Sequence, residues 1–151
     1  VEDTGLPRLV ADAQVLPIWE GTTNVLSADT LRALAHEETR AALDQELSRR
    51  MESIREPSLL AGQKAVGQAL EAARSFWSAN LRDPGRLEAG ARQYAMTLGR
   101  SYEALLMLEH AQHQKQRGGS ERAAAAARRF IAHGLSSFTG VDPADAALLL
   151  S

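Results

Sequence analysis

The feature that most constrains this fold is a spacing of apolar residues that returns at steps of three and four along most of the chain. The spacing is clearest in the run Leu87, Ala91, Tyr94, Leu98, Tyr102, Leu105 and Leu108. Steps of this kind place side chains on one face of an α-helix. Alanine, leucine, arginine and glutamate dominate the composition, and all four favour helices. The sequence therefore predicts an all-α protein.

Proline, glycine and capping residues divide the 151 residues into expected elements. We expect, in chain order, a short helix from Pro7 to about Gln14, an ordered loop from Val15 to Asn24, a long helix from Val25 past Ile54, a helix capped by Ser58 that reaches about Leu81, a helix from Leu87 to Gly118, a helix capped by Ser120 that reaches about His133, and a short helix at Asp142-Pro143. Short connections between long helices predict an antiparallel helical bundle.

The bundle is expected to form one domain with the segment that precedes it. Residues 1–24 would supply the short helix and a candidate active-site loop, and residues 25–151 would form the bundle. The alanine run 123–127 is expected to pack closely on a neighbouring helix, because small side chains let two backbones approach.

The composition argues against several classes of protein. A net charge of −2, with both signs interspersed, does not favour binding to nucleic acid or to an anionic membrane. The absence of cysteine removes disulfides and thiolate chemistry, and it fits a cytoplasmic location. No apolar run is long enough for a transmembrane helix, and no signal-peptide pattern is visible. Because the chain begins at Val1 and not at methionine, it can be a piece of a longer protein.

The segment from Ile18 to Asn24 carries the most unusual chemistry. Glu20 stands between Trp19 and Gly21, and a carboxylate beside a large ring can be desolvated enough to act as a general base. Gly21 lets a ligand approach the backbone. Thr22, Thr23 and Asn24 come at an expected helix N-terminus, where phosphate oxygens bind readily.

A purely structural interpretation of the same segment stays open at this point. One of the residues 22–24 could simply cap the helix, Glu20 could complement the helix dipole, and Trp19 could anchor the loop in a core. Spacing alone does not decide between the two interpretations.

The stretch Ile18-Trp19-Glu20-Gly21-Thr22-Thr23-Asn24-Val25-Leu26 resembles the segment of acyl-CoA dehydrogenases that holds their catalytic glutamate. Asp3, Arg8 and Asp12 match the spacing of a family signature just upstream. The match covers roughly the first 35 residues. It departs from the family at Ala11, where arginine is usual, and at Trp19, where tyrosine or phenylalanine is common. In having tryptophan at position 19, the chain is similar to the adaptive-response, alkylation-induced branch of the family.

The resemblance implies the C-terminal helical domain of an FAD-dependent oxidoreductase of fatty acid metabolism. Glu20 would remove a proton from the carbon beside an acyl-CoA thioester carbonyl, while a hydride passes to FAD. Trp19 and Gly21 would contact the substrate, and Thr22, Thr23 and Asn24 would contact FAD.

The resemblance also implies partners and limits. Electron-transfer flavoprotein or another acceptor would reoxidise the flavin, and the bundle would join protomers into a homodimer or homotetramer. Because the family's glycine-rich motif and β-domain are not in these residues, the chain alone is expected to be inactive and to hold no FAD.

Alternatives from other classes remain. A helical module for oligomerisation or DNA binding could use the basic residues between Arg100 and His133, and an acyl-CoA oxidase would share the same half-reaction. The histidines His36, His110, His113 and His133 include one pair at a spacing of three, but no carboxylate pattern completes a metal site. No metal is expected.

Overall fold

The structure is a computed structural model that describes residues 4–19 and 22–138, with the side chains of residues 16–19 left undescribed. The helices in these ranges are α1 (Leu6–Trp19), α2 (Thr23–Ala35), α3 (Glu37–Ser53), the short 3₁₀ helix η2 (Pro57–Leu59), α4 (Leu60–Asn80), α5 (Pro84–Ala89), α6 (Ala91–Gln116) and α7 (Arg122–Ala132). Neither range contains a strand, which confirms the predicted all-α class. None of the described helices combines the length and apolarity that crossing a membrane requires.

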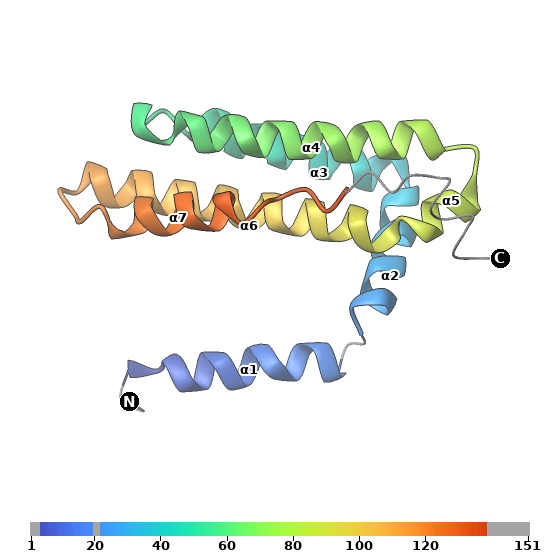
Figure 1. The fold of residues 1–151 in the computed structure, drawn as a ribbon, viewed down its shortest axis with the longest axis horizontal. Helices are drawn as coiled ribbons and strands as arrows, with labels where there is room; N and C mark the ends of the chain where they lie inside the picture. The colour runs from blue at the N-terminus through green and yellow to red at the C-terminus, as the bar shows by residue number, and fades with distance from the viewer. Residues whose placement is uncertain (1–3, 20–21, 139–151) are drawn as a thin grey trace.

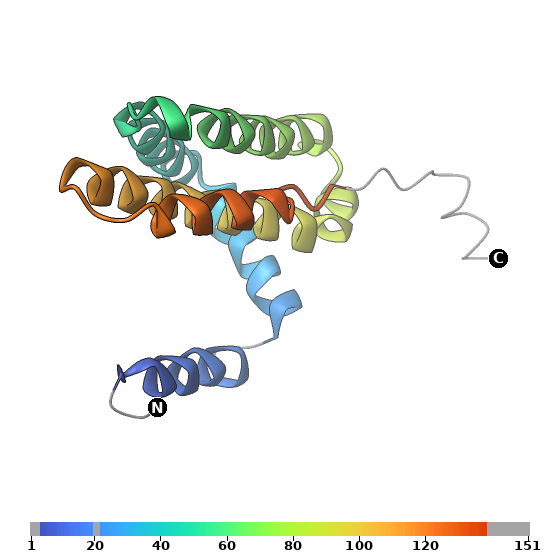
Figure 2. The ribbon, with the colours of Figure 1, turned by 60° about the vertical axis from the view of Figure 1, so that its left-hand side comes forward.

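Helices α3, α4, α6 and α7 lie side by side as an antiparallel bundle, as predicted (Figure 1). Helix α2 crosses one end of the bundle, and α1 stands apart from it in both views (Figures 1 and 2). The predicted helix at Asp142-Pro143 falls outside the described residues.

The core is built around one face of α6. Ala104, Leu105, Leu108 and Ala111 are completely buried there, at the steps of three and four that the sequence predicted. Helix α7 packs on this face through Ala124 and Ala127, which are also buried. The alanine run therefore supplies a close helix contact, as expected, although its other members do not all face the core.

The predicted long helix from Val25 past Ile54 is wrong, because it is divided into α2 and α3 at His36. The backbone of His36 is extended, with φ −75° and ψ 121°. Glu37 and Glu38 open α3, where acidic side chains favour a new helix N-terminus. Arg40 reaches back so that its Nη1 donates to the carbonyl oxygen of Leu34 at 2.7 Å, satisfying the end of α2.

The predicted helix from Leu87 to Gly118 is likewise divided, into α5 and α6. Asp83 caps α5 by accepting a hydrogen bond from the backbone N–H of Arg86 at 3.1 Å. Gly90 stands at the break, and a Cβ added there would lie 2.2 Å from Cζ of Phe76 in α4. Glycine thus allows the α5–α6 junction to press directly against the Phe76 ring.

Three predicted helix boundaries also differ from the structure. Helix α1 continues through Pro17 to Trp19, so the loop expected from Val15 is wrong over that stretch, although the proline removes one intrahelical N–H bond there. The carboxylate of Glu56, and not Ser58, caps the turn before α4, accepting from the backbone N–H of Ser58 at 3.5 Å and also from its hydroxyl at 2.8 Å. Helix α7 begins after Glu121 instead of Ser120.

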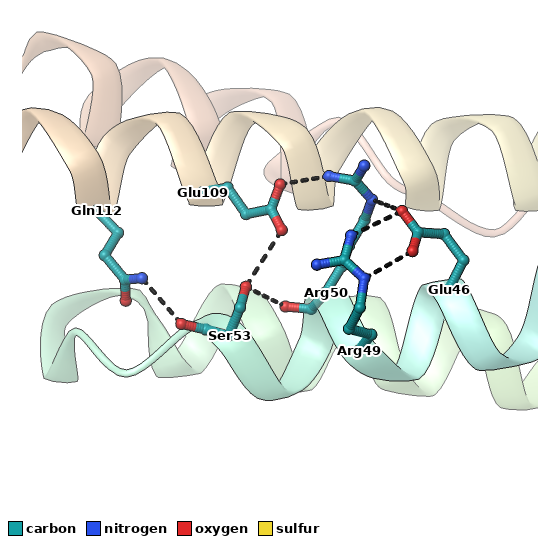
Figure 3. A network of polar contacts seen from close by, with 6 residues as sticks. All are labelled: Glu46, Arg49, Arg50, Ser53, Glu109 and Gln112. Carbon is teal, nitrogen blue, oxygen red and sulfur yellow. Dashed lines mark hydrogen bonds and ion pairs between the residues drawn. The ribbon is translucent and has the colours of Figure 1, made fainter.

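A network of polar side chains holds α3 against α6 (Figure 3). Arg50 donates from Nε to Oε1 of Glu46 at 2.7 Å and from Nη1 to Oε2 of Glu109 at 2.5 Å. The Arg50 guanidinium also lies over the Tyr102 ring, 5.1 Å from its centroid. Because Glu109 and Tyr102 belong to α6, Arg50 links the two helices through both charge and ring contacts.

Gln112 extends this network to the end of α3. Its Oε1 accepts from the backbone N–H groups of Arg55 and Glu56 at 2.6 and 3.0 Å, and its Nε2 donates to the carbonyl oxygen of Ser53 at 2.9 Å. One amide side chain thereby satisfies three backbone groups where the chain leaves the helix.

Two glycines in the same region give a matched test of the packing at the α5–α6 junction. Gly90→Ala should destabilise the fold by about 1–3 kcal/mol, because the added methyl group overlaps the Phe76 ring. Gly99→Ala, within α6, should stabilise it by about 0.5–1 kcal/mol, because its Cβ meets nothing within 4 Å and alanine favours the helix. Urea unfolding of both variants checks the signs, and a stable Gly90→Ala variant would contradict the close approach.

A second prediction concerns acid stability. The hydrogen bond from Arg49, together with that from Arg50, lowers the pKa of Glu46 from 4.5 to about 2. A lowered carboxyl pKa adds stability above the unfolded value that disappears as pH falls toward the folded value. The melting temperature should therefore fall between about pH 4.5 and pH 2, and less steeply in Glu46→Gln.

The matched control for Glu46→Gln is Glu52→Gln on the same helix. Glu52 is exposed and makes no ion pair within the described residues. Its substitution should leave the pH dependence of melting as in the unmodified chain. An equal pH dependence of the melting temperature in both variants would show that the ion pairs of Glu46 do not contribute to acid stability.

Candidate functional site

The candidate site from the sequence lies at the junction between α1 and α2. Helix α1 ends at Trp19 and α2 begins at Thr23. Glu20 and Gly21, the predicted base and substrate contact, lie outside the described residues, and so does the side chain of Trp19. Their roles therefore stay predictions.

The described part of this junction is the first turn of α2. Thr22 takes the N-cap position with an extended backbone (φ −67°, ψ 161°), and its carbonyl accepts from the N–H of Leu26 at 3.0 Å. Its side chain makes no capping hydrogen bond. Thr22, Thr23 and Asn24 are all exposed. Thr22 therefore does not cap the helix with its side chain, as the structural interpretation of this segment would allow.

This helix N-terminus has the chemistry of an anion contact. The first backbone N–H groups of a helix have no partner within it, and the helix dipole favours negative charge at that end. The hydroxyls of Thr22 and Thr23 and the amide of Asn24 stand exposed beside these groups. A phosphate group fits this donor set, and the contacts to FAD expected from the sequence stay a prediction.

Ser27 is a residue of this region that the sequence reasoning missed. It is almost fully buried, and its hydroxyl donates to the carbonyl oxygen of Thr23 at 2.6 Å. Ser27 and Asn24 together line a groove of about 660 Å³ between α2, α5 and the start of α6, with Arg92 on the opposite side. The spacing of four residues between Thr23 and Ser27 was a possible signal, but it is also common in ordinary helices.

Apolar side chains remain uncovered on α1 and on the start of α2. Each of them is more than a third exposed: Leu6, Leu9, Val10, Val15, Val25 and Leu26. Uncovered apolar residues that gather on neighbouring segments mark a surface that another protein element covers. This apolar surface lies on both sides of the predicted loop, and Figure 2 shows α1 with no helix of the bundle beside it.

The upstream signature residues are only partly described. Arg8 and Asp12 form an ion pair on α1, with Nε and Oδ2 3.9 Å apart, and both side chains are strongly exposed. Asp3 lies outside the described residues. Such an exposed ion pair adds little to the stability of the fold. The stability of this chain therefore does not explain why Arg8 and Asp12 are paired.

The histidine pair is not part of a metal cluster in the described ranges. His110 and His113 are both exposed on α6, and the Nε2 atom of His113 lies 3.3 Å from Nη1 of Arg117. Residues 4–19 and 22–138 contain no group of three acidic, cysteine or histidine side chains placed to hold a metal ion.

Comparison with known proteins identifies the family. A family model described as "Acyl-CoA dehydrogenase 11 C-terminal domain-like" matches residues 38–145. The chain is also similar to "Acyl-CoA dehydrogenase family member 11" of Caenorhabditis elegans, with 36% identity over 126 residues. That alignment covers 74% of this chain but 19% of the relative, so the chain spans about a fifth of the relative's length. No solved structure matches the chain.

The family model and the sequence motif lie on different parts of the chain. The motif around Glu20 falls within the first 35 residues, and the family model begins only at residue 38. Their agreement confirms the predicted resemblance, whereas the narrower assignment to the adaptive-response branch stays a prediction. The chain belongs to the acyl-CoA dehydrogenase-like family, as a C-terminal region of the kind described for acyl-CoA dehydrogenase 11.

Proposed function

We propose that this chain is the C-terminal part of an FAD-dependent flavoprotein that α,β-dehydrogenates acyl-CoA thioesters. The observation that carries the proposal is the family match over residues 38–145, joined to the Trp19-Glu20-Gly21 motif that precedes it. FAD, when bound in such a protein, accepts the hydride that leaves the β-carbon of the substrate.

Within this proposal Glu20 is the base that takes the proton from the α-carbon. Its backbone N–H would donate to the thioester carbonyl as negative charge develops there, which is the kind of preorganised donor that lowers such a barrier. Trp19 and Gly21 would border the acyl-CoA, with Trp19 excluding water and Gly21 allowing close approach of the thioester.

Thr22, Thr23 and Asn24 would hold FAD from the N-terminus of α2. Support comes from their exposure, from the missing side-chain cap at Thr22, and from the unpaired first-turn N–H groups of any helix. Ser27 would act indirectly, since its bond to the carbonyl of Thr23 fixes the first turn that carries these donors.

The rest of the parent protein would cover the apolar surface on α1 and α2. This surface borders the predicted loop on both sides, so covering it would also close the site against water. Electron-transfer flavoprotein or another acceptor, association into a homodimer or homotetramer, and a cytoplasmic location belong to the same proposal, as properties of the whole parent.

The role of Glu20 can be tested in the full-length parent. Glu20→Gln should slow reduction of the flavin by acyl-CoA by about 10²- to 10⁴-fold, because the proton acceptor is removed while the shape is kept. FAD should remain bound. Anaerobic stopped-flow absorbance at the flavin band measures the rate.

Glu37→Gln serves as the control for that experiment, because Glu37 is an exposed glutamate of the first turn of α3. It should reduce the flavin at the unmodified rate. Full activity of Glu20→Gln would remove Glu20 from the proposed role, and loss of activity in both variants would point to a general structural effect.

A further prediction concerns the isolated 151-residue chain. It should hold no FAD and show no turnover, because most of the surface around a flavin would come from the remaining four fifths of a protein of the relative's length. Equilibrium dialysis against FAD measures this directly. A chain that retains FAD with a flavin absorbance band after gel filtration would contradict the prediction.

A further inference from the structure

A small cavity between α3, α4 and α6 is separate from the α1–α2 junction. Its volume is about 220 Å³, and its polar lining comes from Arg40, Asp44, Arg74, Trp77, Ser78 and Tyr94. The volume lies below the range of about 300–1,000 Å³ that is common for drug-sized ligands. The cavity therefore suits a small molecule, and its chemistry does not depend on the proposed function.

The first indication of a ligand is the indole of Trp77. This side chain is only 8% exposed, and its buried Nε1–H has no hydrogen-bond partner among the described residues. The indole nitrogen can only donate. Since buried polar groups in folded proteins are nearly always paired, this donor is open to an acceptor that enters the cavity lined by Trp77, once the side chains around Nε1 shift to admit it.

The second indication is the hydroxyl of Tyr94 beside it. The two rings lie 5.4 Å apart between centroids, and Tyr94 is 4% exposed. Its hydroxyl makes no hydrogen bond within the described residues, but unlike Nε1 of Trp77 it is not one of the fully buried unpaired atoms. Burial raises the pKa of Tyr94 to about 12, so the hydroxyl keeps its proton at neutral pH and remains a donor.

The charges around the cavity favour a negative ligand. The Arg40 guanidinium lies over the Trp77 ring, 5.1 Å from its centroid. Its one hydrogen bond within the described residues is to the carbonyl oxygen of Leu34. Arg74 is neutralised by Asp44, with Nη2 and Oδ1 3.0 Å apart. Glu71 lies 3.9 Å from Arg74, but it is 70% exposed and screened by solvent. Among the residues that the structure describes, Arg40 is thus the lining cation without a carboxylate partner.

The remaining wall is apolar. Leu43, Leu70 and Leu98 line the same cavity. A phosphate or sulfate has no apolar part to place against these side chains, whereas a carboxylate with a short hydrocarbon or aromatic body does.

We propose that this cavity binds a small organic monocarboxylate. Its carboxylate oxygens accept from the Trp77 indole N–H and the Tyr94 hydroxyl, Arg40 compensates its charge, and its apolar body packs against the three leucines. The proposed site contains no residue of the motif around Glu20. It also lies in a different part of the bundle from the first turn of α2.

Titration of the chain with benzoate, followed by ¹H–¹⁵N NMR of the indole N–H groups, tests the proposal. The chain has two tryptophans, so Trp19 is an internal control for Trp77. The Trp77 signal should shift and saturate, and the Trp19 signal should stay in place. Benzamide, which has nearly the same shape without the charge, should cause a much weaker change at equal ionic strength.

Tyr94→Phe supplies the matched variant, because it removes one donor and keeps the ring. Benzoate affinity should fall about two- to tenfold, as expected for one hydrogen bond. A Trp77 signal that does not respond to benzoate would show that water alone occupies the cavity. Equal responses to benzoate and benzamide would overturn the anion site. If Tyr94→Phe fails to fold, the comparison of the two ligands on the unmodified chain still decides the proposal.

Discussion

The arrangement of this protein depends on the packing of α6. Ala104, Leu105, Leu108 and Ala111 are fully buried on one of its faces, and helices α3, α4 and α7 gather around it. Burial of each such leucine contributes about 1.5–3 kcal/mol, while the alanines let α7 approach closely. Arg50 and Gln112 then fix α3 to the same helix through Glu109, Tyr102 and the backbone at the end of α3. Both the polar network and the Trp77 cavity are consequences of how neighbours meet α6.

The helical faces were predictable from sequence because they depend on local periodicity, but the breaks were not. The break at His36 depends on Arg40 folding back onto the carbonyl of Leu34, and the break at Gly90 on the Phe76 ring arriving from α4. Both causes are contacts that no local spacing reveals. Pro17 shows the opposite error: a rule about proline predicted a loop, although α1 continues through this residue to Trp19.

The two candidate sites also differ in how far the sequence could predict them. The motif around Glu20 could be recognised because it is continuous in sequence, and the family match over residues 38–145 agrees with it from a separate part of the chain. The sequence placed Tyr94 only on an apolar helix face. Trp77 and Tyr94 line one cavity because α4 and α6 meet beside Arg40, and this is a property of the assembled bundle. Residues far apart in the chain therefore carry the second site.

We propose that the junction of α1 and α2 forms one wall of an acyl-CoA site in a larger flavoprotein. A crystal structure of the full-length parent with FAD and a substrate analogue tests it most directly. We expect the Glu20 carboxylate within about 3–4 Å of the substrate α-carbon, close to the reach needed for proton transfer, with the apolar side chains of α1 covered by the remainder of the parent. A Glu20 carboxylate far from the thioester, with another residue beside the α-carbon, would contradict it.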